Sequence, residues 1–158
     1  MQESEQIQGT VTVTVTDDAG VLMEEEADWL HSIASELSGK TGWSVSAVTC
    51  DGEPQLYVTA ENGILCLVNV NDGTVSFTAD GKAEDYFDSG RIEEIIKEAE
   101  EPITEQDYTQ SLYLMLLRAG EAYEAGEVRH GSVNLWIWAV AAAVLCAAVG
   151  GFWVWRRR

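Results

Sequence analysis

The chain has 158 residues, enough for one domain and an anchor, and 46% of them are hydrophobic. All 27 Asp and Glu residues lie before residue 128, whereas three of the nine Lys and Arg residues end the chain, so the part before these three arginines carries a net charge of −21. Such an acidic surface repels phosphate backbones and anionic lipid head groups, which argues against nucleic acid as a partner. Divalent cations and basic protein surfaces are compatible partners, and the alternative is that the charge serves solubility alone.

Four short segments are predicted to be strands. The valines of residues 11–15 alternate with threonines, as in a half-buried strand, and residues 43–49 alternate again. The nearly continuous apolar run 63–70 indicates a strand that is covered on both faces. Residues 71–73 (NDG) are a tight-turn signal, after which residues 74–78 return as an antiparallel strand.

Three helices complete the predicted domain. The first covers residues 24–38, with acidic residues in its first turn, and the second covers residues 91–99, with isoleucines on one face. Thr104 and Asp107 form a capping-box pattern before a third helix over residues 108–123. The order strand, helix, strand, strand, strand, helix, helix predicts an α/β fold with a mixed sheet and one hairpin.

A single membrane span is predicted at the C-terminal end. Leu135 to Trp155 are 21 residues without a charge, and at about 1.5 Å per residue a helix of this length matches a hydrocarbon core of about 30 Å. Tryptophan pairs flank the segment, and three arginines follow it, which is typical of a cytoplasmic end. We therefore expect a linker at 126–132, a transmembrane helix at 133–155 and a basic cytoplasmic end at 156–158.

This topology places the N-terminal domain outside the cytoplasm, at the cell membrane. Residues 1–10 form a polar extension (MQESEQIQGT) without the apolar core of an export signal. Either a signal has been removed, or the chain is tail-anchored with its domain inside. We favour the first alternative.

The sequence offers few groups for nucleophilic catalysis. Cys50 and Cys66 fall in predicted strands, so we expect two buried thiols rather than a disulfide, and Cys146 falls in the predicted span. His31 lies between the stripe positions of the first helix and His130 lies in the linker, so neither has an evident Ser or Cys partner.

Four aspartates are candidate metal ligands. Asp17 and Asp18 end the first predicted strand, where α/β folds usually bind their ligands. Two adjacent carboxylates can share a hard cation such as Ca²⁺, which prefers oxygen ligands, and Asp85 and Asp88 near the loop after the fourth strand can add more. The alternative is a role in turns and helix caps, because an Asp side chain readily bonds nearby backbone amides.

Several segments together resemble one known family. Residues 13–24 (VTVTDDAGVLME), residues 62–67 (NGILCL), residues 71–87 (NDGTVSFTADGKAEDYF) with the helix that starts near Asp88, and the pair Asp107-Tyr108 are similar, in this order, to the TPM-domain family. The resemblance covers about residues 10–125. It implies a three-layer α/β/α sandwich with a mixed sheet over residues 11–125, which here precedes one C-terminal transmembrane helix.

The resemblance also implies a location and candidate activities. Family members lie outside the cytoplasm and include a thylakoid-lumen protein tied to photosystem II repair and many membrane-anchored bacterial proteins. Some members bind calcium, and phosphatase activity has been attributed to the plant member. Two departures concern loops near the expected site: Met23 replaces the usual Ser or Thr before the first helix, and residues 51–61 replace most of the family's second helix.

We therefore expect a membrane-anchored, extracytoplasmic interaction domain that binds other membrane or envelope proteins and serves in their assembly or maintenance, with Ca²⁺ as its candidate cofactor. The alternative is a metal-assisted phosphomonoesterase, similar to an acid phosphatase, in which the aspartates hold a metal-activated water. The two differ in one observable way. An enzyme should gather carboxylates in a pocket, whereas a binding module should expose an apolar patch or groove.

Overall fold

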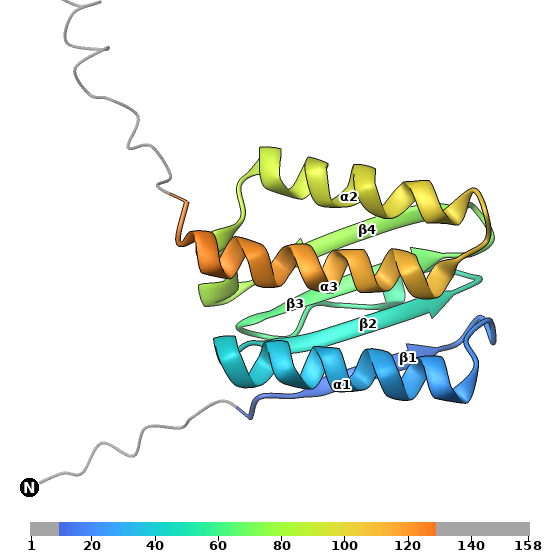
Figure 1. Cartoon of the computed structure of the whole chain (residues 1–158), viewed down its shortest axis with the longest axis horizontal. Coiled ribbons are helices and arrows are strands. Elements are labelled where there is room, and N and C mark those ends of the chain that lie inside the picture. Colours follow the sequence, from blue (N-terminus) through green and yellow to red (C-terminus); the bar gives the residue numbers. More distant parts are fainter. Residues whose placement is uncertain (1–9, 129–158) are drawn as a thin grey trace, which may run out of the picture. The chain divides into compact units, whose positions relative to one another are not determined.

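The computed structural model describes residues 10–128, which form a four-stranded sheet and its helices (Figure 1). The elements in chain order are β1 (Val13–Asp17), α1 (Glu24–Thr41), β2 (Ser44–Cys50), η1 (Pro54–Leu56), β3 (Gly63–Asn69), β4 (Thr74–Ala79), η2 (Gly81–Tyr86), α2 (Ser89–Ile103) and α3 (Tyr108–Ala125). Every strand and helix predicted for this part of the chain is present, and the two short 3-10 helices η1 and η2 are additional.

The sheet is mixed, as predicted, with the strand order β1-β2-β3-β4. Strands β1, β2 and β3 run parallel, whereas β4 runs antiparallel to β3. One row across the sheet joins Val15, Ala47, Cys66 and Phe77, whose side chains therefore lie on the same face. This face belongs to the larger core of the domain.

All three helices cover that one face (Figure 1). Helix α1 packs on β1 and β2, α2 packs on β4, and α3 lies between them and also contacts β3. The expected three-layer sandwich is therefore wrong in one layer, because residues 10–128 place no α-helix on the opposite face.

The connection between β2 and β3 explains the missing layer. Residues 51–62 must return along parallel strands of seven residues, a path of roughly 23 Å at about 3.3 Å per residue. A helix made of all these residues would rise only about 18 Å and would leave none for the turns at its ends. Gly52 and Pro54 also disfavour helix, and the segment forms only the single turn η1.

The loop covers the second face of the sheet in place of a helix. Tyr57 packs against a small core formed by Val48, Cys50, Leu65 and Leu67. Leu65 is 6% exposed and Leu67 is 3% exposed, which confirms the prediction that β3 is covered on both faces. One aromatic side chain and its loop therefore replace a whole helix as the cover of this face.

All three α-helices extend two to four residues beyond their predicted C-terminal ends. Helix α2 continues through Pro102 to Ile103, so Thr104 caps its C-terminal end and donates its hydroxyl to the carbonyl of Glu101 (2.8 Å). The predicted capping box of Thr104 and Asp107 is therefore wrong. Asp107 alone caps α3, where it accepts a hydrogen bond from the amide of Gln110 (2.9 Å).

The predicted membrane span at 133–155 and the basic end at 156–158 lie outside the described residues. Between residues 10 and 128, no helix combines the length and the apolar character that crossing a bilayer requires.

Candidate functional site

Asp17 organises the turn between β1 and α1. One carboxylate oxygen, Oδ1, accepts hydrogen bonds from the Val21 amide (3.1 Å) and the Thr49 hydroxyl (2.5 Å), and the other, Oδ2, accepts from the Leu22 amide (3.0 Å). Burial opposes the ionisation of Asp17, but these hydrogen bonds and one from the amide of Gly20 outweigh it and hold the pKa of Asp17 below its ordinary value. The carboxylate thus serves the local structure of the loop.

Asp18 is exposed at the same edge of the sheet and accepts a hydrogen bond from the Tyr57 hydroxyl. This hydrogen bond is the main reason that the pKa of Tyr57 rises to about 12. Burial raises the pKa of the neighbouring Cys50 thiol, and the charges of Asp51, Asp18 and Asp72 raise it further. Asp18, Asp51 and Asp72 follow β1, β2 and β3, so three exposed carboxylates lie near Cys50 at this edge of the sheet.

Asp85 and Asp88 lie at the opposite edge of the sheet from Asp17 and Asp18. They follow β4, whose last residue, Ala79, pairs with Ile64 at the start of β3. Asp88 caps α2 by accepting a hydrogen bond from the Arg91 amide (2.8 Å). Asp85 is exposed on η2. The structure therefore separates the four predicted ligands into two pairs and does not bring the pairs together.

The carboxylates have the oxygen chemistry that Ca²⁺ prefers, but they are not arranged as a preformed site. Within residues 10–128, no three His, Cys, Asp or Glu side chains are grouped so that they could hold one metal ion. Asp17 and Asp88 are already engaged with backbone amides. Asp18, Asp51 and Asp72 are exposed at the carboxyl edge of the sheet, but they do not form such a group either.

The two thiols of the sheet are buried and free, as predicted. Cys66 is fully buried, and this burial raises the pKa of its thiol, which makes it a poor nucleophile. His31 is exposed on α1, where its Nδ1 lies 3.5 Å from the Ser35 hydroxyl. These groups support an architectural role rather than nucleophilic catalysis.

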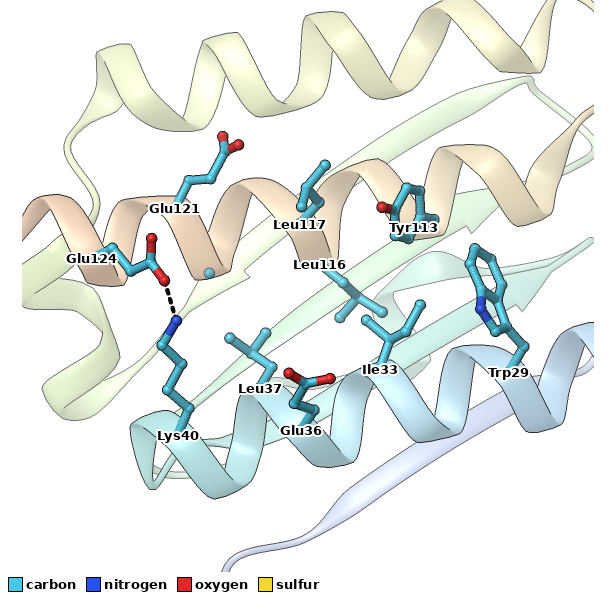
Figure 2. A pocket seen from close by; sticks show the side chains of 11 residues that line it. Trp29, Ile33, Glu36, Leu37, Lys40, Tyr113, Leu116, Leu117, Glu121 and Glu124 are labelled. Atoms are coloured by element: carbon cyan, nitrogen blue, oxygen red, sulfur yellow. Dashed lines mark hydrogen bonds and ion pairs between the residues drawn. The ribbon is translucent and has the colours of Figure 1, made fainter.

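An apolar groove of about 540 Å³ lies between α1 and α3 (Figure 2). Its floor is formed by Ile33, Leu37 and Leu116. Trp29 is 45% exposed and Leu117 is 38% exposed, although both are large and apolar. Two of the six exposed large apolar residues of the described domain thus lie in one concave surface, which is typical of a binding site.

The groove has an aromatic end and a charged end. At one end, the rings of Trp29 and Tyr113 lie 5.0 Å apart. At the other, Lys40 and Glu124 form an ion pair from α1 to α3, and the hydrogen bond from Lys40 holds the pKa of Glu124 below its usual value. Figure 2 shows both ends, with Glu36 beside the charged one. The two helices therefore run in the same direction along the groove.

Gly120 lies within α3, in the wall of the groove. A glycine inside a helix costs about 1 kcal/mol relative to alanine. A Cβ atom at this position would meet only Cδ1 of Leu37 at 3.6 Å, which is an ordinary van der Waals contact. The packing of α1 on α3 therefore does not require glycine here, and the glycine keeps the groove open at a cost to stability.

Sequence reasoning found the apolar stripes of α1 and α3 but missed this groove. The available signal is the width of the stripes. Trp29 and Ile33 widen the buried row of α1, and Leu117 widens that of α3. When the apolar stripe of a helix is wider than the face that packs on the sheet, the remaining apolar residues indicate a second contact surface.

Solved structures of low sequence identity share this fold. An N-terminal domain from P. gingivalis has a TM-score of 0.60 at 20% identity, over 70% of this chain and 82% of that one. An N-terminal domain from Corynebacterium glutamicum has a TM-score of 0.58 at 8% identity, over 82% and 90%. The BA42 protein of the psychrophilic bacterium Bizionia argentinensis has a TM-score of 0.53 at 16% identity, over 64% and 80%.

A search of curated proteins gives no match. The family model of the TPM domain, in contrast, matches residues 15–122, from the first strand to the last helix. This range contains the turn of Asp17, the loop-covered face of the sheet and most of both walls of the groove. The chain therefore belongs to the TPM-domain family.

Proposed function

We propose that this TPM domain is an interaction module, anchored at a membrane and facing outward, that serves in the assembly or maintenance of membrane or envelope proteins. The groove between α1 and α3 is the observation that carries this proposal. It combines an apolar floor with an exposed charged rim, as binding surfaces do. The expected difference between an enzyme and a binding module therefore favours the module.

The positions of the aspartates also support a module. A metal-assisted hydrolase needs carboxylates that converge on one ion and its bound water. Here Asp17 and Asp88 bond to backbone amides at opposite edges of the sheet, and Asp85 lies apart on η2. We accordingly derive no catalytic step for these residues.

The anchor and its orientation can be tested on intact cells. A chain with Cys146→Ser and Gly131→Cys carries one exposed thiol in the predicted linker, beside the buried Cys50 and Cys66. A membrane-impermeant thiol reagent should label this position without permeabilisation. Labelling only after permeabilisation would contradict the outward orientation, and recovery of the chain in the soluble fraction would contradict the anchor.

The interaction itself can be tested by photo-crosslinking in native membranes. A photoreactive residue at Trp29, in the groove, is compared with one at Leu56, which is exposed on η1 on the other side of the sheet. We expect discrete adducts with membrane or envelope proteins from at least one position. Their complete absence from both positions, together with hydrolysis of a phosphomonoester in the presence of Ca²⁺, Mg²⁺ or Mn²⁺, would favour the phosphatase alternative.

We also propose that the domain takes up Ca²⁺ at the acidic carboxyl edge of the sheet, where Asp18 and Asp51 are exposed and water molecules would supply the remaining oxygen ligands. Bringing like charges together is unfavourable, and a divalent cation removes that cost. Ca²⁺ at about 100 times its dissociation constant should add roughly 2.7 kcal/mol to stability, which a thermal melt detects.

The control for this test is Na⁺ at matched ionic strength, because screening responds to ionic strength and a site responds to the ion. Asp18→Asn with Asp51→Asn should abolish the Ca²⁺-specific rise in melting temperature. Asp28→Asn with Asp85→Asn, two exposed acids elsewhere, should leave it intact. An equal shift with Ca²⁺ and matched Na⁺ would show that the domain has no calcium site.

A further inference from the structure

We propose that the groove between α1 and α3 receives a basic amphipathic helix of a partner protein. The inference rests on the proposed interaction function and names the surface and the chemistry of the partner. Three features carry it: the shape of the groove, the space at Gly120 and the charge of the rim.

The groove has the length and direction of a short helix. Its wall on α1 extends from Trp29 to Lys40, and its wall on α3 extends from Tyr113 to Glu124, about 16 Å each at 1.5 Å per residue. The two walls run side by side in the same direction (Figure 2). About three turns of a partner helix fit this length, with apolar anchors at positions i, i+3 or i+4, and i+7.

Gly120 indicates where an anchor lies. The fold has room for a methyl group at this position, since a Cβ atom added there would have Leu37 Cδ1 as its nearest neighbour, at 3.6 Å. Glycine here leaves a hollow in an otherwise apolar wall, next to the exposed Leu117. Packing within the domain does not explain why this residue is glycine, whereas a partner side chain that fills the hollow does.

The rim selects a basic partner. Glu36, Glu121 and Glu124 line the groove. Lys40 is paired with Glu124 and Arg118 is paired with Glu121, so Glu36 is the carboxylate of this lining that has no ion pair among the described residues. The negative ends of the α1 and α3 dipoles lie at this same charged end. Basic residues of the partner therefore belong beside Glu36 and the C-terminal ends of α1 and α3, and its apolar anchors belong toward Trp29 and Tyr113.

The same charge argues against other occupants. A second copy of the chain would bring two acidic rims together, and an anionic lipid surface would face carboxylates. A basic helix removes this repulsion and covers Trp29 and Leu117 at once. An apolar groove alone would accept any of these three occupants. Electrostatic complementarity favours the basic helix over a second copy of the chain and over an anionic lipid surface.

The test uses the full chain in detergent and a labelled synthetic peptide of 14 residues that places leucines at i, i+3, i+4 and i+7 and lysines elsewhere. Fluorescence anisotropy at fixed ionic strength measures its dissociation constant. Two comparison peptides replace every lysine by glutamate or scramble the same composition so that no apolar face remains. We expect each of them to bind at least tenfold more weakly than the basic amphipathic peptide.

Matched variants locate the binding surface. Gly120→Leu fills the hollow and should weaken binding at least tenfold, whereas Gly39→Leu, at an exposed helical glycine with open space, should change it less than twofold. Trp29→Ala with Leu117→Ala gives a second test that keeps the buried core unchanged. Glu36→Gln with Glu124→Gln should weaken binding at least threefold, and the charge-matched pair Glu100→Gln with Glu101→Gln should not.

Equal effects of Gly120→Leu and Gly39→Leu, or of the two glutamine pairs, would overturn the inference, because they would show diffuse attraction to an acidic protein. Self-association of the chain that Gly120→Leu abolishes would also overturn it in favour of a second copy. Photo-crosslinking to membrane proteins from Leu56 alone would leave the interaction function standing and remove only this surface. Adducts from Trp29 that Gly120→Leu prevents would support both.

Discussion

The two buried thiols of the sheet should become accessible through different openings of the domain. Cys50 is 2% exposed and lies under Tyr57 and the loop 51–62, whereas Cys66 is fully buried under the helix layer. A loop with few buried contacts opens locally at a lower free energy than a packed helix layer. Cys50 should therefore react with a thiol reagent faster than Cys66 under native conditions.

A small core substitution separates the two openings. Ile95 is buried in α2 within the helix-side core, and Ile95→Val should cost about 0.5–1.5 kcal/mol. Since 1.4 kcal/mol corresponds to a factor of ten, the labelling rate of Cys66 should rise about two- to tenfold. The rate of Cys50 should stay the same, because opening the loop leaves the contacts of Ile95 intact.

The assay is alkylation of the full chain carrying Cys146→Ser, with each thiol quantified by mass spectrometry over time. Tyr57→Ala is the complementary variant. It removes the contact that covers Cys50, so it should speed the labelling of Cys50 more than that of Cys66. If Ile95→Val accelerates Cys50 and Cys66 in parallel, the loop opens only with the whole domain, and its description as a separate cover is incorrect.

Three further predictions concern single side chains. Leu67→Ala should lower the free energy of unfolding by about 2 kcal/mol, the low end for a buried leucine because the loop can relax into the space, and urea titration followed by circular dichroism measures this. Asp88→Ala should cost about 1 kcal/mol in the same assay through loss of the α2 cap. Asp17→Asn should cost about 1–3 kcal/mol at pH 7. Since folding lowers the pKa of Asp17, its contribution is present above the unfolded pKa and lost as pH falls through the folded value, so the difference from wild type should shrink below about pH 4 and stay constant above pH 5.

The sequence was sufficient for the order and type of the elements because each carries a local periodic signal. Alternating valines marked β1, and the continuous apolar run marked the doubly covered strand β3. The layer count failed because it came from the family resemblance, although residues 51–62 were visibly short. The distance that a helix spans per residue, applied to this segment, decides the question without a structure.

The candidate site was harder to predict because it depends on contacts between distant segments. The acidic turn at Asp17 is local in sequence, and its alternative role in turn formation is the one seen in its hydrogen bonds. That Asp85 and Asp88 lie at the far edge follows from the antiparallel hairpin, which the sequence did predict. The groove, by contrast, needs the relative placement of α1 and α3, which no periodicity within either helix specifies.

Helix α1 connects the acidic turn to the groove. Through this connection, a residue that positions the helix, such as Asp17, can be distinguished from a candidate Ca²⁺ ligand, such as Asp18. Asp17 bonds the amides of Val21 and Leu22, and the carboxylate of Glu26 accepts from the amide of Met23 (2.8 Å), so these two acids fix where α1 begins. Trp29, in the groove wall, lies less than two turns further along the same helix. Asp17→Asn should therefore lower both the melting temperature and the affinity of the groove for the basic peptide, without Ca²⁺ present. Asp18→Asn, at an exposed neighbour whose carboxylate accepts a hydrogen bond from Tyr57, should leave both unchanged and reduce only a Ca²⁺-specific shift. Loss of peptide affinity in Asp18→Asn but not in Asp17→Asn, measured by the same anisotropy titration, would contradict this coupling through α1.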